Sequence, residues 1–475
     1  MSDVEIKKCK LYKKCGGCQI HNLTYDKQLL FKMKKVVKLM GKFHRVENII
    51  GMDNPYHYRN KVQAAFGRDR NNRIISGVYQ SSTHKIVPVD SCLIEDEKAD
   101  EIIVTIRKLI KSFKLKPFDD KKMTGFLRHV LIKRGFLSGE IMVVLVTGEE
   151  AFKSKRSFIN ALLGRHPEIT TIIQNINNRR TSLVLGEKSI TLYGDGVIKE
   201  QLCGYTFTIS PKAFYQINPV QTEVLYNKAM EFADIQKDDI VIDAYCGTGT
   251  IGIIASKYAK QVIGVELNKD AVKDARKNAK LNDIKNIDFV CADAGRYMVD
   301  IADEGLSADV VIMDPPRAGS DIKFLKSVVK LSPRKVVYIS CNPETCARDI
   351  LFLSKNKYKV RKIQPVDMFP HTEHVETVVL LRRKNIDDHL EFTWTDKDFG
   401  NKGSRATYPD IKAYVQDKYD IKVSTLAIAQ TKAKCGIIER QNYNKPKSEK
   451  SKQPGCTKER EDAIIDAFRH FQMIP

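Results

Sequence analysis

A series of short apolar runs, separated by segments of helical periodicity, occupies the chain between about Phe207 and Arg383. Segments such as Ala271–Leu281 and Ile322–Leu331 have the apolar spacing of helices. The runs between them have the length of strands buried on both faces, and they read IVIDA, VIGVEL, ADVVIMD, KVVYIS and VETVVLL. Strands that alternate with helices predict a doubly wound parallel sheet, so we expect an α/β, Rossmann-like domain over residues 206–384.

Two further regions precede this domain. Residues 1–57 contain a cysteine-rich opening and one predicted helix, Tyr25–Met40. Over residues 58–205 the pattern changes to short strands and turns, with helical pieces near Ala99–Phe113 and Ser157–Leu163. This pattern predicts a central α+β domain built on an antiparallel sheet. The apolar positions at helical spacing in the first helix are Leu29, Leu30, Met33, Val36, Val37 and Met40.

Residues 385–475 form a separate extension. We expect two helices near Tyr408–Lys418 and Thr425–Lys434, joined by a short DIKVS turn, and a final helix near Glu459–Phe471. A polar, basic stretch, NYNKPKSEKSKQPG, precedes the final helix. The first pair has helix-turn-helix spacing, which leaves open a small packing cap or a module that docks on nucleic acid.

The net charge of +22 suggests a polyanionic partner such as nucleic acid, although lysines spread over solvated faces give the same number. No apolar run is long enough to span a bilayer, and the N-terminus has no apolar core of a secretory signal. We therefore expect a cytoplasmic protein, and a monomer.

A glycine-rich turn, Ala244–Thr250, leads from the first apolar run into a helix. The next strand ends at Glu266, where a carboxylate can accept both ribose hydroxyls, and later strands end at Asp293 and Asp314. The turn lacks the third glycine of dinucleotide-binding loops, which favours S-adenosylmethionine over NAD. A Rossmann-like domain without a ligand remains the alternative.

Cys341 follows the strand KVVYIS, and Glu376 opens the strand VETVVLL. Carbon 5 of a uracil is a weak nucleophile until a thiolate adds to carbon 6, and a base must later remove the carbon 5 proton. A helix that begins near Pro343 is expected to lower the pKa of the Cys341 thiol. Cys346 is a reserve nucleophile, but its helical position favours core packing.

Four of the eleven cysteines form a candidate metal site. Cys9, Cys15 and Cys18 lie close in sequence, and Cys92 is the remote fourth thiol. Four thiolates can hold zinc or a 4Fe–4S cluster, and the spacing alone does not separate the two.

These motifs resemble the RNA uracil-5-methyltransferases, in particular an iron–sulfur branch that acts on 23S ribosomal RNA. The resemblance covers roughly residues 5–383 and rests on the segments CKLYKKCGGCQ, GFLRHVLIKRG, SPKAFYQINPVQTEVLY, DAYCGTGTIG, GVELN, MDPPRAG, YISCNPETCARD and FPHTEHVE. It implies a class I S-adenosylmethionine-dependent methyltransferase domain, an RNA-binding central domain and an iron–sulfur N-terminal segment.

The resemblance also implies roles for single residues. Cys341 resembles the nucleophile and Glu376 the general base, while Arg128 resembles an arginine near the RNA. A 4Fe–4S cluster is implied at Cys9, Cys15, Cys18 and Cys92. The cofactor contacts implied are Gln216, Tyr245, Thr250, Glu266 and Asp314, with Asp293 also plausible.

The chain also departs from the family pattern. We expect it to lack the β-barrel RNA-binding domain that is common at the N-terminus of this family, and its C-terminal extension is additional. RNA docking on that extension is therefore a hypothesis. Methylation of tRNA is an alternative activity, and a non-catalytic iron–sulfur protein that binds RNA is an alternative of another class.

Overall fold

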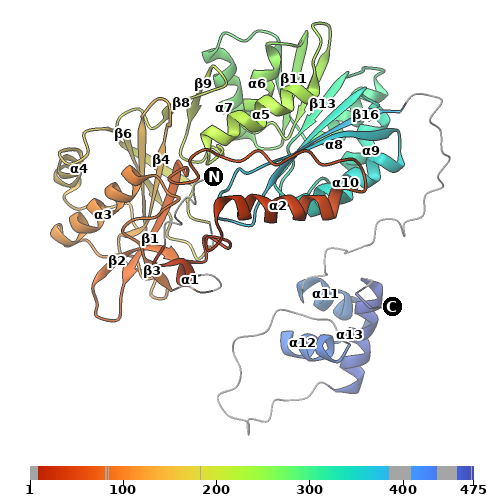
Figure 1. The fold of residues 1–475 in the computed structure, drawn as a ribbon. Coiled ribbons are helices and arrows are strands. Elements are labelled where there is room, and N and C mark those ends of the chain that lie inside the picture. Colours follow the sequence, from red (N-terminus) through yellow and green to blue (C-terminus); the bar gives the residue numbers. More distant parts are fainter. Residues whose placement is uncertain are drawn as a thin grey trace. The chain divides into compact units, whose positions relative to one another are not determined.

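A computed structural model describes residues 9–80, 83, 85–181, 183–384, 408–435, 457–471 and 473–474. The chain divides into two compact units, Met1–His389 and Leu390–Pro475. The larger unit contains two seven-stranded sheets and a two-stranded hairpin (Figure 1). Within the described residues, no helix combines the length and apolar character that a membrane crossing requires.

The first sheet has the strand order β3-β2-β1-β4-β5-β6-β7, and its helices share one apolar core with the central strands. It is mixed, which corrects the expected antiparallel sheet: β5 and β6 run parallel. The reason is that α4 crosses over between them and returns the chain to the same edge of the sheet. The elements are β1 (Lys61–Arg68), β2 (Ile74–Tyr79), β3 (Ile86–Pro88), α3 (Glu97–Ser112), β4 (Leu127–Arg134), β5 (Ile141–Thr147), α4 (Lys155–Leu163), β6 (Ile169–Ile176) and β7 (Lys188–Tyr193).

The opposite face of this sheet is also covered. Alternate residues of β4 and β5, such as Leu131 and Val144, pack with Ile198 and Ile209 of the hairpin formed by β8 (Ile198–Leu202) and β9 (Tyr205–Ile209). Because side chains of a strand alternate between faces, β4 and β5 are buried along nearly their whole length.

The second sheet has the order β12-β11-β10-β13-β14-β16-β15. Its first five strands are parallel, as expected, but β16 is antiparallel to both β14 and β15. Residues 367–375 join β15 to β16 without a crossover helix, so the chain reverses direction. The last residues of β14 and β15 and the first residue of β16 therefore lie at the same end of the sheet. The strands are β10 (Ile240–Ala244), β11 (Gln261–Glu266), β12 (Ile287–Cys291), β13 (Val310–Met313), β14 (Lys335–Ser340), β15 (Tyr358–Val366) and β16 (Glu376–Arg383).

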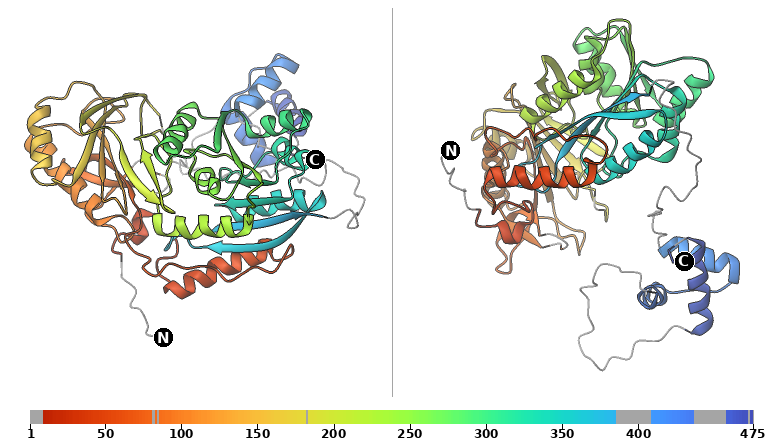
Figure 2. Two further views of the ribbon diagram at one scale, coloured as in Figure 1. Left: turned by 90° about the horizontal axis from the view of Figure 1, so that it is seen from above. Right: turned by 45° about the vertical axis from the view of Figure 1, so that its right-hand side comes forward.

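Helices cover both faces of the second sheet (Figure 2). One group shares the core formed by the strands, and it comprises α5 (Pro219–Ala233), α6 (Thr250–Ser256) and α7 (Lys269–Leu281). The other group packs together on the opposite face, and it comprises α8 (Ala294–Asp303), α9 (Ile322–Leu331) and α10 (Pro343–Lys355). This is the layered α/β architecture that the sequence predicted.

The N-terminal segment contains α1 (Tyr12–Cys15) and α2 (Tyr25–Met40), and α2 packs beside the edge strand β15 and against α10. Only some of the apolar positions that indicated α2 are buried: Val36 and Met40 are, whereas Leu30 and Val37 are 53% and 45% exposed. Two polar residues, Gln28 and Lys32, are fully buried on the same face. Polar residues are buried there because the loop after β15 supplies their partners.

The smaller unit has a core of its own. Its helices are α11 (Tyr408–Tyr419), α12 (Thr425–Lys434) and α13 (Lys458–His470), close to the expected bounds. Ile411, Ile428 and Phe468 are fully buried in this core. Both α11 and α12 pack against α13. The basic stretch expected between the second and third helices lies outside the described residues.

Candidate active site

β14 and β16 bring Cys341 and Glu376 to the same edge of the second sheet. The two strands are antiparallel, and Ser340 pairs with Thr377 at the end of their register. One step further, Cys341 and Glu376 therefore stand opposite each other. The charge of Glu376 raises the pKa of Cys341, so the thiol and the carboxyl group are electrostatic neighbours.

Two carboxyl groups share this edge. Burial raises the pKa of Glu376 well above its usual range, the charge of Asp314 raises it further, and Arg317 acts in the opposite sense. Burial also raises the pKa of Asp314, which follows β13, to about 7. Carboxyl groups that share a poorly solvated site resist ionising together. Both acids therefore hold protons more tightly than exposed carboxyl groups do.

The thiol of Cys341 is not activated in the expected way. Burial raises its pKa to about 11, with further contributions from the charges of Glu376 and Asp314. Arg317 lowers the pKa through its charge and a side-chain hydrogen bond, but it does not outweigh the other effects. The expectation that this thiol has a lowered pKa was therefore wrong.

The local start of α10 explains why the helix does not offset burial. Pro343, the first residue of the helix, has no N–H to offer. The side chain of Asn342 caps the helix and accepts a hydrogen bond from the N–H of Glu344 at 3.1 Å. Pro343 therefore has no N–H for the Cys341 thiolate, and the N–H of Glu344 already donates to Asn342.

Arg317 is a site residue that the sequence analysis missed. Its guanidinium donates to the His374 ring at 3.0 Å. Its carbonyl oxygen accepts hydrogen bonds from Asn342 at 3.1 Å and from Thr345 at 3.3 Å, which fasten the segment after β13 to the start of α10. Arg317 therefore holds a positive charge near Cys341. The available signal was its position directly after the two prolines that follow a strand end.

Tyr226 of α5 joins two of the predicted cofactor contacts, and the sequence analysis missed it. Its buried hydroxyl group hydrogen-bonds with the side chains of Thr250 and Gln216. Burial raises the pKa of Tyr226, and the charge of Asp314 adds to that effect. The side chains of Gln216 and Thr250 therefore meet at this hydroxyl group, with the charge of Asp314 nearby. A tyrosine on the apolar face of a helix predicts only packing, so the sequence carried little signal.

The glycine-rich turn and Glu266 form the next part of the site. The Glu266 carboxylate accepts hydrogen bonds from the N–H of Gly247 at 3.1 Å and of Asn268 at 2.8 Å. Gly247 has a φ of 54°, and a Cβ built there meets nothing within 4 Å. Gly249 has a φ of 82°, and a Cβ there lies only 2.7 Å from the Phe289 ring. The turn therefore borders open space at Gly247, whereas at Gly249 it packs tightly against Phe289.

Tyr245 and Asp293 extend the site along the strand ends. The Tyr245 ring centroid lies 5.0 Å from that of Phe324. Asp293 is exposed and caps α8, because its carboxylate accepts a hydrogen bond from the N–H of Arg296 at 2.9 Å. Burial raises the pKa of Tyr245, and the charge of Asp293 is a smaller contribution in the same direction. The turn after β10 and the end of β12 are therefore adjacent.

These groups suit S-adenosylmethionine by their chemistry. Glu266 and Asp293 are acceptors for hydroxyl and amino donors. Burial is what raises the pKa of Asp314, and no cation offsets it within the described residues. A positively charged sulfonium or ammonium group stabilises such a carboxylate. The opening above Gly247 leaves room for a ligand beside Glu266.

The loop that precedes Glu376, residues 367–375, is held by hydrogen bonds to α2. The Lys32 ammonium donates to a carboxylate oxygen of Asp367 at 2.5 Å and to the carbonyl of Phe369 at 2.9 Å. The side chain of Gln28 accepts from the N–H of His371 at 2.8 Å and lies 3.1 Å from the His371 ring nitrogen. Buried polar groups of α2 therefore hold residues 367–371 in place.

The cysteine-rich segment contacts the same loop. The N–H of Ile20 donates to the His371 carbonyl at 3.1 Å, and the His21 and His371 rings approach to 3.3 Å between their Nδ1 atoms. The N–H of Cys9 lies 3.1 Å from Nε2 of His21. A chain of contacts therefore connects the cysteine-rich segment with the loop that leads to Glu376.

The four cysteines expected to bind a cluster are half-buried free thiols. Burial raises the pKa of the Cys18 thiol to about 12, and the charge of Glu95 contributes to the raised pKa of Cys15, Cys18 and Cys92. Cys9 interacts electrostatically with Cys15 and Cys18. Within the part of the chain that the structure describes, no three His, Cys, Asp or Glu side chains are arranged to hold a metal.

Two other predicted residues have packing contacts. Arg128 is 7% exposed, and its guanidinium donates to the carbonyl of Arg179 at 2.9 Å and pairs with Asp120 at 2.9 Å. Cys346 is fully buried in α10. These contacts support structural roles for both side chains.

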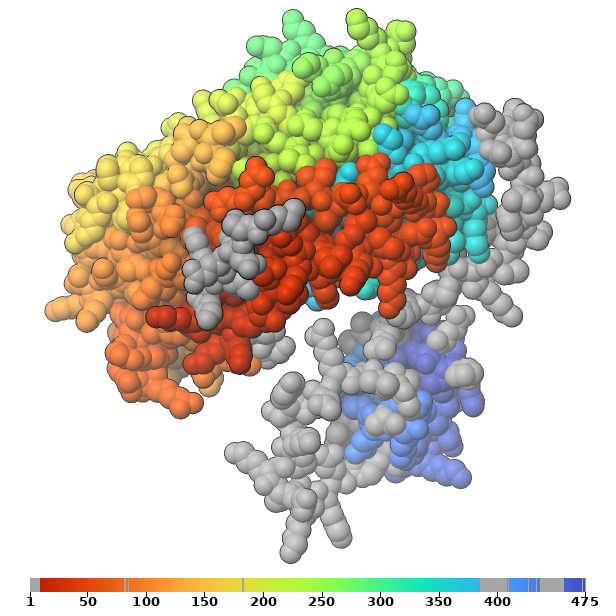
Figure 3. Space-filling model, viewed as in Figure 1, coloured from red at the N-terminus to blue at the C-terminus, as the bar shows by residue number. Residues whose placement is uncertain are grey.

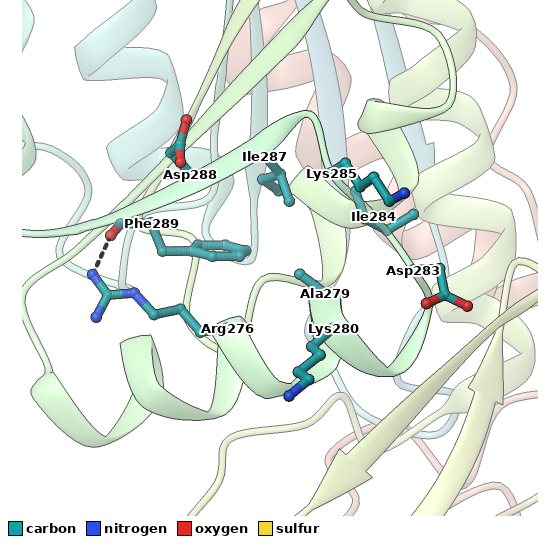
Figure 4. Close-up of a pocket in the computed structure, with 9 residues that line it drawn as sticks. All are labelled: Arg276, Ala279, Lys280, Asp283, Ile284, Lys285, Ile287, Asp288 and Phe289. Atoms are coloured by element: carbon teal, nitrogen blue, oxygen red, sulfur yellow. Dashed lines mark hydrogen bonds between the residues drawn. The ribbon is translucent and has the colours of Figure 1, made fainter.

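A pocket of about 430 Å³ lies between α7 and the start of β12 (Figure 4). Arg276, Lys280 and Lys285 contribute basic groups, while Asp283 and Asp288 contribute acidic ones. β12 is the edge strand farthest from β16 and β15 in the sheet order. The pocket is therefore separate from the strand ends near Cys341.

Comparisons with known proteins agree with this architecture. A family model described as tRNA (uracil-5-)-methyltransferase matches residues 24–384. An uncharacterized RNA methyltransferase of Clostridium tetani is 43% identical over 377 residues, which cover 78% of this chain and 82% of the relative. One of Staphylococcus aureus is 40% identical over 381 residues, covering 79% and 84%. The structure of the Pyrococcus abyssi tRNA (uracil-54, C5)-methyltransferase with S-adenosyl-L-homocysteine aligns with a TM-score of 0.65 and 30% identity, covering 77% of this chain and 85% of that chain.

Proposed function

Because this chain belongs to the tRNA (uracil-5-)-methyltransferase family of S-adenosylmethionine-dependent RNA methyltransferases, we propose that it methylates carbon 5 of a uridine in 23S ribosomal RNA. The observation that carries this proposal is the placement of Cys341 opposite Glu376 at one strand edge. A thiol and a carboxyl group on two sides of one base are the groups that this reaction requires.

In the proposed mechanism, the sulfur of Cys341 adds to carbon 6 of the uracil, and the ring electrons shift towards carbon 5. The thiol passes its proton to solvent water in this step, because its pKa of about 11 keeps it protonated near neutral pH. Arg317 stabilises the thiolate electrostatically. S-adenosylmethionine, when bound, supplies the methyl group that carbon 5 receives. We assign its binding to Gln216, Tyr245, Thr250, Glu266, Asp293 and Asp314.

Glu376 completes the reaction as the base. Its carboxylate removes the proton from carbon 5, the carbon 5–carbon 6 double bond forms again, and the bond from carbon 6 to the Cys341 sulfur breaks. Glu376 must first release its own proton to solvent water, and its raised pKa then makes the carboxylate a stronger base for this step. The uridine must leave its stack to reach both groups, which costs least in an RNA loop.

A tRNA uridine is the second candidate substrate. The observation that favours it is the similarity to the Pyrococcus abyssi tRNA (uracil-54, C5)-methyltransferase at 30% identity and a TM-score of 0.65. Both substrates place the same chemistry at Cys341 and Glu376, so only the RNA distinguishes them.

We also propose that Cys9, Cys15, Cys18 and Cys92 hold a 4Fe–4S cluster of structural function. The support is the donor chemistry of four half-buried thiols: Cys9, Cys15 and Cys18 interact electrostatically with one another, and Cys92 shares with Cys15 and Cys18 the influence of Glu95. Iron and acid-labile sulfide in anaerobically purified protein are the expected result. Zinc without iron or sulfide contradicts the cluster and leaves the methyltransferase proposal intact.

Methyl transfer to unmodified transcripts tests the proposed function. Transcripts of 23S ribosomal RNA and of tRNA are labelled with tritium at carbon 5 of uridine, and tritium release reports loss of the carbon 5 proton. Release from 23S ribosomal RNA, with 5-methyluridine at the reacting position, supports the proposal. Release from tRNA alone contradicts the ribosomal substrate. Cofactor binding and RNA binding without release from either RNA indicate a non-catalytic RNA-binding protein.

A further inference from the structure

The outward face of α2 exposes both basic and apolar side chains in one stripe. Leu30, Phe31 and Val37 are 53%, 43% and 45% exposed. Exposed lysines alternate with them at intervals of three or four residues, which places all of these side chains on one face of the helix. We define the α2 stripe as Lys27, Leu30, Phe31, Lys34, Val37 and Lys38.

Packing against the rest of the molecule does not explain this face. An amphipathic helix normally buries its apolar residues and exposes its charged ones. Here Gln28 and Lys32 are fully buried, while Phe31 is exposed. The space-filling view shows α2 along the surface of this face of the molecule (Figure 3).

The helix that carries the α2 stripe is close to the proposed active site. Lys35, in the middle of α2, acts electrostatically on His374, which accepts a hydrogen bond from Arg317. The same helix packs against α10, which begins directly after Cys341 and Asn342. A strand of RNA that leaves the active site and follows α2 would reach the stripe on its outward face.

We propose that the α2 stripe binds a single-stranded segment of the substrate RNA that flanks the target uridine. Lys27, Lys34 and Lys38 contact phosphates, and the Phe31 ring stacks on a base. Leu30 and Val37 provide the apolar border of the stacked base. This inference rests on the proposed function and adds a docking surface to it.

The charge of the α2 stripe favours RNA over the C-terminal unit, residues 390–475, as its binding partner. Asp26 is the sole acidic residue of α2, so the helix surface is strongly positive. The C-terminal unit, residues 390–475, has 16 Lys and Arg against 12 Asp and Glu, a net charge of +4. Docking of that unit on the stripe would bring positive surfaces together. A polyanion with stackable bases matches both the lysines and the exposed ring.

The salt dependence of binding tests the lysines. The full-length triple variant Lys27→Gln, Lys34→Gln, Lys38→Gln is titrated with a fluorescent single-stranded oligouridylate at several salt concentrations. Each lost phosphate contact reduces the slope of log affinity against log salt by about 0.7 for single strands. A decrease of about 2 in slope is therefore expected. The matched control replaces the exposed lysines 269, 273 and 277 of α7 by glutamine and should keep the wild-type slope.

The ring of Phe31 gives a second, independent measurement. Phe31→Leu keeps an apolar side chain but removes the ring, and we expect it to weaken oligouridylate binding about fivefold or more. Phe31→Trp should bind at least as well as the wild type. Equal binding by both variants contradicts stacking. A photoreactive phenylalanine analogue at position 31 should crosslink to RNA, whereas crosslinks to residues 390–475 or to a second copy contradict the proposal.

Methyl transfer by the same proteins separates this inference from the proposed function. If the wild type methylates RNA and the triple lysine variant keeps both affinity and salt slope, the docking surface is wrong and the enzyme assignment stands. If the wild type fails to methylate any RNA while the variants lose RNA affinity, the docking surface stands and the enzyme assignment is wrong.

Discussion

The ammonium group of Lys32 lies 2.5 Å from a carboxylate oxygen of Asp367, and both side chains are fully buried. The hydroxyl group of Tyr25 donates to the other oxygen of the same carboxylate at 2.9 Å. This buried pair joins α2 to the loop that leads into Glu376. A change in α2 can therefore alter the position of the proposed base.

Removal of the ammonium group should destabilise the fold. Lys32→Met leaves the buried Asp367 carboxylate without its cation, and we expect the free energy of unfolding to fall by about 3–5 kcal/mol. Urea denaturation measures this change. The control is Lys98→Met, which breaks an exposed pair with Glu101 and should cost less than about 1 kcal/mol. A Lys32→Met effect as small as the control would show that the pair does not hold the loop. Adding Asp367→Asn to Lys32→Met should recover part of the loss.

The two proposed catalytic groups should fail at different stages. Cys341→Ala should abolish methylation, because no sulfur remains to add to carbon 6. Glu376→Gln should allow addition and methyl transfer but not loss of the carbon 5 proton, so a covalent protein–RNA adduct should accumulate on denaturing gels. Cys346→Ala is the matched control, since that thiol is fully buried in α10. Full activity of Cys341→Ala would rule out the covalent mechanism.

The pH dependence should reveal the role of Arg317. Burial raises the pKa of Cys341 to about 11, and Arg317 lowers it. Removal of this cation with Arg317→Met should raise the thiol pKa further, so the rate of adduct formation should rise only at higher pH. Arg317→Lys keeps the charge and should restore part of the wild-type profile. Identical pH profiles for all three proteins would mean that Arg317 does not act on the thiol.

The free energy of unfolding should decrease as the pH rises, because Asp243, just before the glycine-rich turn, is a buried acid. Burial raises the pKa of Asp243 to about 8, although its carboxylate accepts a hydrogen bond from the N–H of Gly252 at 2.7 Å. A carboxyl group with a raised pKa binds its proton more tightly in the folded state. Its stabilising contribution is complete below about pH 4 and is lost as the pH rises to about 8.

The measurement is the free energy of unfolding at pH 5 and pH 8. Asp243 should contribute up to about 1.4 kcal/mol per pH unit to the loss within this interval, and Asp243→Asn should reduce the slope by that amount while the contributions of Asp314 and Glu376 remain. Asp270→Asn changes an exposed acid of α7 and should leave the wild-type slope in place. An unchanged slope in Asp243→Asn would assign the effect to other groups.

Local patterns predicted the helices well. The bounds of α2 and α9 agree with the expected ranges, because apolar residues with a period near 3.6 report a helix wherever it packs. The strand β15 was missed, since Lys359, Arg361 and Lys362 interrupt its apolar residues at the sheet edge. The antiparallel direction of β16 was also missed, because its apolar run reads the same in either direction.

Some features of the candidate site were likewise predicted from the sequence, and others were missed. The strand ends before Cys341 and Asp314 were visible in the sequence, as was the turn before Thr250. Tyr226 and Arg317 were not, because their importance comes from groups that approach them from other segments. The raised pKa of Cys341 also escaped prediction, since burial beside two carboxyl groups is a property of the assembled edge.

The sequence by itself determined the alternation of strands and helices, the residue types available for chemistry and the family. These properties follow from local periodicity and from the identity of side chains. Tertiary structure decided that Cys341 faces Glu376, that Lys32 is buried on Asp367 and that Phe31 remains exposed. Strand register, side-chain burial and the charged groups near a residue are set only when distant segments pack together. Each of them depends on distances between segments that are far apart in the sequence.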